Sequence, residues 1–255
     1  MEIDRIWPDY RRFCETRAIA RSSGLCEMRD LTGANPTTLL PLADFLRKAH
    51  MDEAARVVEG GLCGGPSSSI LRLQGDTQAI NEVGTAIADQ VQWGRGYGGR
   101  NAFIYLMGEL MQNVHDHSDS DNAFIMAQES RGAGFVEMSV LDDGITVAGS
   151  LRRSGIIFDD DIEAIAMAMN GLSSKREGRR GFGLRTSVRI CVRGLRGRIL
   201  TVSGRGAVEI GGGGAEGKDT LEGYSIEDKF YHLEGTLVSV RIPLQEREVD
   251  IYGFT

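Results

Sequence analysis

Long hydrophobic runs and cysteine pairs are absent from this sequence, and prolines are few. No apolar run approaches the roughly 18–20 residues needed to cross a bilayer, and the residues after Met1 show no basic stretch leading into an apolar signal core. We therefore expect a cytoplasmic protein with no membrane partner. The 34 glycines are too irregularly spaced for collagen, and 41% hydrophobic residues are too many for a disordered chain. The composition predicts a globular, loop-rich protein with one main core and a smaller piece.

The four cysteines are scattered, with no C-x-x-C pair and no histidine at ligand spacing from them. They are Cys14, Cys26, Cys63 and Cys191. A zinc site or a disulfide framework is therefore not expected. We interpret the cysteines as reduced thiols, and small buried hydrophobic residues are the simplest role for them.

Charge is unevenly distributed along the chain. The net charge of -7 argues against a protein that coats nucleic acid. Between residues 175 and 198, however, there are nine basic residues and one acid, Glu177. The basic residues are Lys175, Arg176, Arg179, Arg180, Arg185, Arg189, Arg193, Arg196 and Arg198. This local excess suits an anionic ligand or an acidic partner, and a solvated basic helix face is the alternative.

A break rich in glycine over residues 60–67 divides the chain. We place a domain boundary there, with an N-terminal α/β segment at residues 1–66 and the main domain at residues 67–255. In the first segment, a short strand is expected at residues 25–31. A helix is expected to begin at Pro36 and to run to about residue 59.

In the main domain, helices and strands alternate around hairpins. The spacing of Phe103, Met107 and Leu110 predicts a helix over residues 100–117 with one buried stripe. Strands are expected at 69–73, 123–128, 135–141, 198–203, 207–210 and 236–243, and further helices after Asp76, at 160–169 and at 182–192. The pattern favours an α+β fold, a two-layer α/β sandwich whose mixed, mostly antiparallel sheet carries helices on one face.

Four short segments carry the residues of chemical interest. On the helix over residues 100–117, Glu109, Asn113 and His117 follow at intervals of four and share one stripe. An amide oxygen suits a hard cation such as Mg²⁺ that is held mainly through phosphates, and a carboxylate beside it can orient or deprotonate a nucleophile. A solvated helix face is the alternative interpretation of this spacing.

The other three segments follow in order. Residues 140–144 are an apolar strand that runs into Asp142 and Gly144. A carboxylate at such a place can accept a hydrogen bond from an exocyclic amine such as that of adenine. An ordinary Asp-Gly turn is the alternative interpretation. Residues 178–184 place glycines before a helix, so that backbone N–H groups can approach phosphate, although the spacing is neither a Walker P-loop nor a dinucleotide fingerprint. Thr236 follows Gly235 at the start of the last strand.

In order and spacing, these segments resemble the N, G1, G2 and G3 boxes of the Bergerat-fold ATP-binding family. That family includes the ATPase domains of sensor histidine kinases, DNA gyrase and anti-sigma-factor serine kinases. The resemblance covers about residues 68–244, and its opening layout is most similar to that of the anti-sigma-factor kinases. It implies a Bergerat-type sandwich that binds ATP and Mg²⁺.

The resemblance also implies a role for individual residues. Glu109 would be the general base, Asn113 the Mg²⁺ ligand and Asp142 the adenine contact in a loop shaped by Gly144, while Thr236 would hold the adenine end through water. The other nucleotide-binding residues that it implies are His117, Lys175, Arg179, Arg180, Gly181, Phe182, Gly183 and Leu184. Residues from about 150 to 180 would form the nucleotide lid, whose ordering depends on ATP in that family.

The chain departs from the family pattern at three places. Thr146 replaces the second glycine of the G1 box, which would stiffen or narrow the adenine loop. Asp116 stands where histidine kinases often have a basic residue, so it would weaken triphosphate binding unless the basic lid residues compensate. His50 lacks the basic residue and proline that follow a phosphoacceptor histidine, so we interpret it as an ordinary surface or half-buried residue.

The N-terminal segment carries a second resemblance. Residues 26–31 and 35–40 are similar to the strand, loop and helix around the acceptor Ser/Thr of STAS-type anti-sigma-factor antagonists. The segment is too short for a full domain of that type, so the similarity implies a remnant. A simple packing appendage is the alternative.

Together these features predict an Mg-ATP-binding regulatory protein that hydrolyses ATP or transfers its γ-phosphate to a protein partner, such as a STAS-type regulator. One alternative is a non-catalytic module in which ATP orders the lid to present a partner surface. Another is an ATP-driven clamp on nucleic acid, which the acidic net charge disfavours. Dimers are common in the family, so a homodimer is a further expectation.

Overall fold

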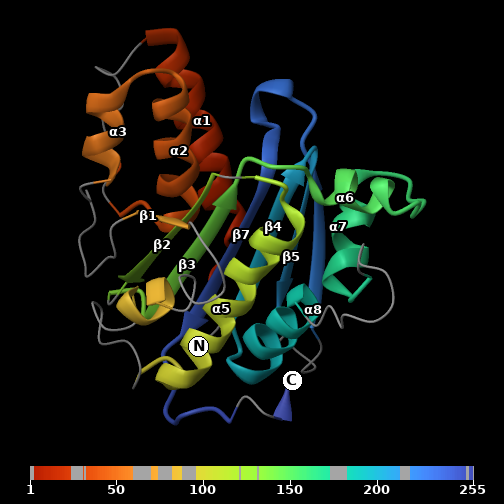
Figure 1. Ribbon diagram of the computed structural model, residues 1–255. Helices are drawn as coiled ribbons and strands as arrows, with labels where there is room; N and C mark the ends of the chain where they lie inside the picture. Colours follow the sequence, from red (N-terminus) through yellow and green to blue (C-terminus); the bar gives the residue numbers. More distant parts are fainter. Residues whose placement is uncertain are drawn as a thin grey trace.

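The computed structural model describes residues 3–23, 31, 33–59, 70–73, 82–87, 96–120, 122–130, 132–172, 183–212, 219–250 and 253–254. Its centre is a seven-stranded sheet with the order β1-β2-β3-β7-β4-β5-β6 (Figure 1). The strands are β1 (Leu71–Leu73), β2 (Ala123–Ser130), β3 (Phe135–Asp142), β4 (Arg198–Gly204), β5 (Gly206–Gly211), β6 (Thr220–Ser225) and β7 (Leu233–Pro243). Each neighbouring pair of these strands is antiparallel, so the expectation of a mixed sheet is wrong for the described strands.

Helices cover both faces of the sheet (Figure 1). The helices are α1 (Trp7–Ser23), α2 (Pro36–Lys48), α3 (Asp52–Glu59), α5 (Arg100–His117), α6 (Val147–Arg153), α7 (Asp161–Met169) and α8 (Gly183–Val188), which continues into a π-helical turn, η3 (Arg189–Gly194). A single 3₁₀ turn, η4 (Lys229–Tyr231), precedes β7. α1, α2 and α3 lie on one face, and α5, α7 and α8 lie on the other. The main-domain helices that pack on the sheet, α5, α7 and α8, therefore lie on one face, as predicted, and the N-terminal helices add a third layer on the other face.

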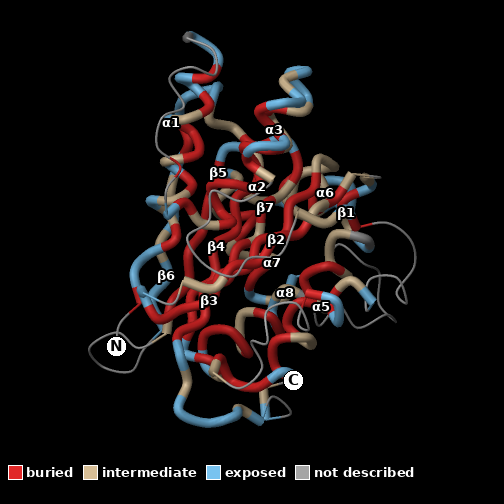
Figure 2. The backbone as a smooth tube through the Cα atoms, turned by 90° about the vertical axis from the view of Figure 1, so that its left-hand side faces the viewer, coloured by how far each residue is buried: buried red, intermediate tan, exposed pale blue. Residues whose placement is uncertain are grey.

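Alternate residues of the strands supply the two cores, since successive side chains of a strand point to opposite faces. Val140 of β3 and Ile199 of β4 pack in the same core as Phe103 of α5. Leu141 and Leu200, the next residue in each strand, pack in the same core as α1 and α2. Figure 2 shows the central strands as a continuous buried block between these layers. The N-terminal segment thus packs on the rest of the chain.

Two buried carboxylates of the sheet hold the N-termini of α1 and α2. Glu209 of β5 accepts hydrogen bonds from the backbone N–H groups of Ile6, at 2.9 Å, and Trp7, at 3.1 Å. Glu137 of β3 accepts hydrogen bonds from the backbone N–H group of Thr37, at 2.9 Å, and from its hydroxyl, at 2.6 Å. Because the first N–H groups of a helix lack partners within the helix, each carboxylate satisfies donors that would otherwise be unbonded.

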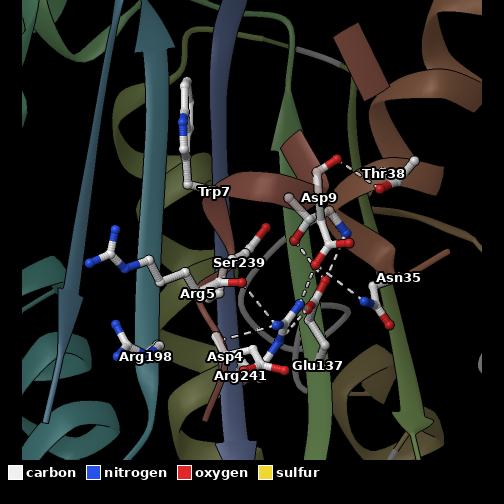
Figure 3. Close-up of polar contacts among 12 residues, drawn as sticks. Asp4, Arg5, Trp7, Asp9, Asn35, Thr38, Glu137, Arg198, Ser239 and Arg241 are labelled. Atoms are coloured by element: carbon white, nitrogen blue, oxygen red, sulfur yellow. Dashed lines mark hydrogen bonds and ion pairs between the residues drawn. The ribbon is translucent and has the colours of Figure 1, made fainter. Parts of the chain in front are cut away.

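Arginines from neighbouring strands balance these two carboxylates. The Nε of Arg241 in β7 donates to Glu137 at 2.8 Å, and the same guanidinium forms an ion pair with Asp9 of α1 (Figure 3). Arg198 of β4 lies 3.5 Å from Glu209. All four sheet residues of these pairs are at most 9% exposed. The N-terminal layer is therefore attached to the sheet by buried charge as well as by apolar packing.

The helix predicted from Pro36 to about residue 59 is two helices. His50 lies between them with a φ of 57°. The backbone N–H of Met51 donates to Leu46 O at 2.9 Å, and that of His50 donates to Arg47 O at 2.9 Å. This pair of bonds is the Schellman motif, which ends α2 with His50 in the left-handed conformation. His50 is exposed, in agreement with its interpretation as an ordinary residue.

Several other predicted elements agree with the structure. The helix over residues 100–117 and the β2–β3 hairpin are confirmed, and Asp160 caps α7 by accepting a hydrogen bond from the backbone N–H of Glu163 at 2.8 Å. Cys14 and Cys191 are buried thiols, as the simplest interpretation predicts. Within the part of the chain described here, no helix is long and apolar enough to span a membrane.

Some expectations lie wholly or largely outside the described residues. These are the strand at residues 25–31, the boundary at 60–67 and most of the helix after Asp76, of which residues 82–87 are helical. Four elements of the described chain were not predicted: α1, α6, β6 and the 3₁₀ turn η4.

Candidate functional site

A cavity of about 120 Å³ lies beside the C-terminal end of α5, between α6, α7, α8 and the strands β3 and β7. Its walls include five residues predicted from the sequence, which come from four elements of the fold. They are Asn113, His117, Asp142, Leu184 and Thr236. Most of the remaining wall is apolar, formed by Leu110, Val114, Ile145, Val147, Leu151, Leu172 and Val238. A mostly apolar cavity with a few convergent polar groups is typical of a small-molecule site.

The α5 helix presents Asn113 to the cavity because Phe103, Met107 and Leu110 hold the preceding turns of the helix in the core. The amide nitrogen Nδ2 of Asn113 is buried and has no hydrogen-bond partner among the described residues. Such an atom costs a protein about 1–3 kcal/mol. Asn113 therefore marks a place where a ligand can supply a missing hydrogen bond.

Glu109 departs from the predicted stripe. It lies one turn before Asn113 on α5 and is not among the residues that line the cavity. Burial raises the pKa of its carboxyl, and a hydrogen bond with Tyr105 acts in the opposite direction. A carboxyl whose pKa is raised above its ordinary value is a better proton acceptor and so suits a general base. The role of Glu109 as the base stays a prediction.

Among the ionisable residues that line the cavity, Asp142 is the most buried, with 3% of its surface exposed. Its Oδ1 accepts a hydrogen bond from the backbone N–H of Gly144 at 2.9 Å, and its register partner in β7 is Thr236. Burial raises the pKa of Asp142 to about 7, although the backbone N–H groups of Gly144 and Thr236 act to lower it. A buried carboxyl at the wall of a cavity, whose surroundings disfavour its ionised form, is typical of a binding or catalytic site.

The adjacent Asp143 has the opposite character. It forms a salt bridge with Lys48 of α2 at 3.2 Å and accepts hydrogen bonds from Ser120 and Asn122. Burial by itself would raise the pKa of Asp143, but the bond from Ser120 and the charge of Lys48 prevail and lower it. Asp143 does not line the cavity and forms structural contacts, whereas Asp142 belongs to the cavity wall.

Two glycines allow the backbone around Asp142 to pack closely. A Cβ on Gly144 would lie 1.9 Å from Ser118 O, the same oxygen that accepts the backbone N–H of Ile145 at 2.7 Å. Gly235 has a φ of 85°, and a Cβ there would lie 2.1 Å from Asp142 O. No other residue type fits at these two positions without a shift of the backbone.

Thr146 begins a helix, a role that the sequence did not indicate. Its hydroxyl accepts a hydrogen bond from the backbone N–H of Gly149 at 3.0 Å and caps α6. Within the predicted lid, residues 150–172 form the end of α6, a connection and α7, and α7 packs on β4 and β5. This part forms a folded wall of the cavity, and its role as a nucleotide lid stays a prediction. Residues 173–180 lie outside the described residues.

The predicted phosphate side is described in part. Five of its residues lie outside the described part of the chain: Lys175, Arg179, Arg180, Gly181 and Phe182. Gly183 begins α8, and Leu184 and Arg185 line the cavity. The stem of Arg185 crosses Gly171 so closely that a Cβ on this glycine would lie 2.6 Å from Arg185 Cδ. Sequence reasoning noted Arg185 in the basic run but missed its place at the site.

The described residues hold no group of three or more His, Cys, Asp or Glu side chains that could bind a metal ion. Asn113 could serve as a single protein ligand to Mg²⁺, because this ion keeps several waters and takes other ligands from substrate phosphates. Asp116, which was expected to add negative charge near a triphosphate, does not line the cavity and accepts a hydrogen bond from Gln112 at 3.1 Å.

Comparison with known proteins does not identify a family for this chain. No family model matches the sequence, and a search of the curated proteins finds no relative. Any assignment of function rests on the residues of the cavity and on their chemistry.

Proposed function

We propose that this protein binds Mg-ATP with the adenine ring in the cavity beside α5, and that it is a regulatory ATPase or protein kinase of Bergerat type. The observation that carries the proposal is Asp142, a buried hydrogen-bond acceptor that lines a mostly apolar cavity. The order and spacing of the four sequence segments add support, because residues from all four of them line this one cavity.

The chemistry of the wall suits an adenine ring. The Asp142 carboxylate accepts a hydrogen bond from the exocyclic amine, and apolar residues such as Ile145 and Leu172 cover the faces of the ring. Asn113 Nδ2 is a donor that a ligand can satisfy. A cavity of about 120 Å³ is smaller than the roughly 300–1,000 Å³ of complete small-molecule sites, so it takes the base end of the nucleotide.

The phosphates then extend toward the start of α8, where Leu184 and Arg185 line the cavity. The guanidinium of Arg185 supplies positive charge for them. Mg²⁺ would be held by Asn113 together with the phosphates, and its charge would neutralise that of the triphosphate during transfer.

Phosphoryl transfer asks the protein mainly for positioning and charge neutralisation. Glu109 is the proposed base, which orients or deprotonates water or the hydroxyl of a protein partner. Burial raises its pKa above the ordinary value of a glutamate, which makes the ionised carboxylate a better proton acceptor. Because Glu109 does not line the cavity, it would act on the phosphate side of Asn113 and not on the adenine side.

A non-catalytic module that uses ATP to order a partner surface is the second candidate. The position of Glu109 outside the cavity wall favours it, since a general base must reach the group that it deprotonates. In this case ATP binds through Asp142 and Asn113 but is not consumed, and the partner is a regulator such as a STAS-type protein.

The test follows γ-labelled phosphate from Mg-ATP, with direct measurement of ATP affinity in the same variants. We expect Asp142→Asn to weaken ATP binding at least tenfold, while the matched variant Asp143→Asn stays within a few-fold of the wild type. Asn113→Ala should remove the Mg²⁺ dependence of binding. Equal ATP affinity in the wild type and in Asp142→Asn would refute the adenine contact.

The fate of the label separates the two candidates. Free phosphate that disappears in Glu109→Gln identifies an ATPase, and label retained on this chain or on an added partner identifies a kinase. ATP that binds and remains intact identifies the non-catalytic module. Turnover in Glu109→Gln equal to that of the wild type would rule out Glu109 as the base.

A further inference from the structure

A second hollow lies next to the first, between the end of α7, the continuous α8–η3 helix and strands β5 and β6. Its volume is about 410 Å³. Val188, Val192 and Ile210 contribute apolar surface to it, and three arginines, Arg185, Arg189 and Arg193, contribute positive charge. Its size falls within the roughly 300–1,000 Å³ of small-molecule sites.

The change from α-helix to π-helix keeps the three arginines together. In an α-helix the residue four positions on lies slightly beyond one full turn, so a series at intervals of four drifts around the axis. Arg185 lies in the α-helical part, and Arg189, four positions later, is the first residue of the π-helical turn. The π-helical turn bonds residue i to residue i+5, as in the 2.8 Å bond from Leu195 N to Ile190 O. Four residues then fall short of a full turn, and Arg193 returns toward the face of Arg185.

The charges around this hollow are not balanced. Arg193 Nε donates to Asp219 at 2.9 Å, and the Asp219 side chain is 33% exposed. Arg185 and Arg189 form no ion pair or hydrogen bond with any described residue. The lining therefore holds three arginines and one acid, a net charge of +2.

We propose that this hollow is a second ligand site, specific for a phosphate monoester with an apolar or aromatic body. A phosphate monoester carries a charge of about −1.5 to −2 at neutral pH, which matches the lining more closely than the single charge of a carboxylate. Guanidinium groups bind phosphate oxygens through paired N–H donors. The apolar surface of Val188, Val192 and Ile210 takes the organic part of the ester.

This site is distinct from the nucleotide cavity. Arg189 follows Gly183, the first residue of α8, by six positions, which corresponds to about 9 Å along a helix axis. The nucleotide cavity reaches only the first turn of α8. Arg185 lines both hollows, so occupation of one site by an anion alters the electrostatic potential at the other. The ester is therefore expected to change ATP affinity through Arg185 without entering the cavity.

The first experiment titrates the full chain, without nucleotide, with phenyl phosphate in a calorimeter. We expect Arg189→Gln and Arg193→Gln each to weaken binding at least tenfold. Arg196→Gln is the matched control, since it removes the same charge from an exposed arginine that does not line the hollow, and it should stay within twofold. Thermal melting of each variant verifies that it is folded. Benzoate, with the same ring and one charge, should bind at least tenfold more weakly than phenyl phosphate.

Further titrations identify the source of the phosphate and separate this site from the nucleotide cavity. Tighter binding of a capped phosphotyrosine peptide than of phenyl phosphate indicates a phosphorylated side chain, and weaker binding indicates a small free ester. Asp142→Asn should leave phenyl phosphate binding unchanged even if it abolishes ATP binding. Failure of the wild type to bind phenyl phosphate at millimolar concentration, equal loss in Arg196→Gln, or loss in Asp142→Asn would each overturn the proposal.

Discussion

Asp142 should make the free protein less stable at neutral pH, because the folded chain opposes the ionisation of this carboxyl. Its pKa rises from the ordinary value of 3.8 to about 7, mainly through burial. The substitution Asp142→Asn removes the ionisable group, and its side-chain oxygen can still accept the hydrogen bond from Gly144 N that Oδ1 now accepts at 2.9 Å. We therefore expect the variant to be more stable than the wild type at pH 8, although it binds ATP less well.

The size of the effect follows from the difference in pKa between the folded and the unfolded chain. At about 1.4 kcal/mol per pH unit, an increase of about three units makes the ionised form about 4 kcal/mol less stable in the folded state. Asp142 keeps its proton to higher pH in the folded chain than in the unfolded chain. The free energy of unfolding therefore falls as the pH rises from about 4 to about 7. About 2–3 kcal/mol of this fall lies between pH 5 and pH 8.

Urea unfolding at both pH values measures this difference. Tryptophan fluorescence reports it, since Trp7 stacks on Tyr224 with ring centroids 4.4 Å apart. The stability gained by Asp142→Asn should be about 2–3 kcal/mol larger at pH 8 than at pH 5. Asp143→Asn is the control and should lower stability instead of raising it. The folded chain lowers the pKa of Asp143, so its ionised form stabilises the fold above about pH 4, and the loss should be equal at both pH values. An equal gain at both pH values, or a loss at pH 8, would refute the argument for Asp142.

Three further substitutions test the fold around the site, each by equilibrium unfolding in urea. Gly144→Ala should destabilise the protein by at least about 2 kcal/mol, whereas Gly132→Ala, with open space around it, should be neutral or stabilising. Glu137→Gln should lower the free energy of unfolding by about 3–5 kcal/mol, because the buried Arg241 keeps only a weakened partner. The control Glu15→Gln, in an exposed ion pair, should change it by no more than about 0.5 kcal/mol. His50→Gly should stabilise the fold by about 1 kcal/mol, since glycine adopts a φ of 57° without strain.

Elements with strong local signals could be predicted from the sequence. The apolar stripe of α5 has the helical period and sets its bounds correctly. The capping residue Asp160 gives the start of α7, and the alternating strands around residues 132–134 give the β2–β3 hairpin. In each case the stabilising contacts are within the element or with the next one along the chain.

α1 and β6 were missed because neither has a regular apolar pattern of its own. The first N–H groups of α1 are bonded to Glu209, more than two hundred residues away, so no local capping residue marks the helix. Its buried side includes Tyr10, Phe13 and Cys14, but charged residues interrupt the apolar pattern. β6 is an edge strand whose residues are exposed or half-buried, so it lacks the apolar alternation of the central strands.

Part of the predicted set of site residues comes together in the structure. Asn113, Asp142 and Thr236 come from three separate segments, and the structure brings all three to one cavity. Their spacing in the sequence could not tell which side of α5 faces the sheet, and Glu109 consequently lies outside the cavity wall. Arg185 could not be selected because a basic run does not show which of its members lies beside a cavity.

The covering of the second face of the sheet by the N-terminal helices was not predicted, and this has a single physical cause. Strand β3 alternates apolar residues with Glu137 and Ser139, and an alternating antiparallel strand normally has its polar side in water. Here the polar side is buried under α1 and α2, and the polar groups bond to one another. Ser139 and Ser239 share a hydrogen bond at 2.8 Å, and Glu137 is bonded to Arg241 and to the start of α2. A buried polar face of this kind cannot be distinguished from a solvated one until the residues that satisfy it are known, and here most of them lie about one hundred positions away.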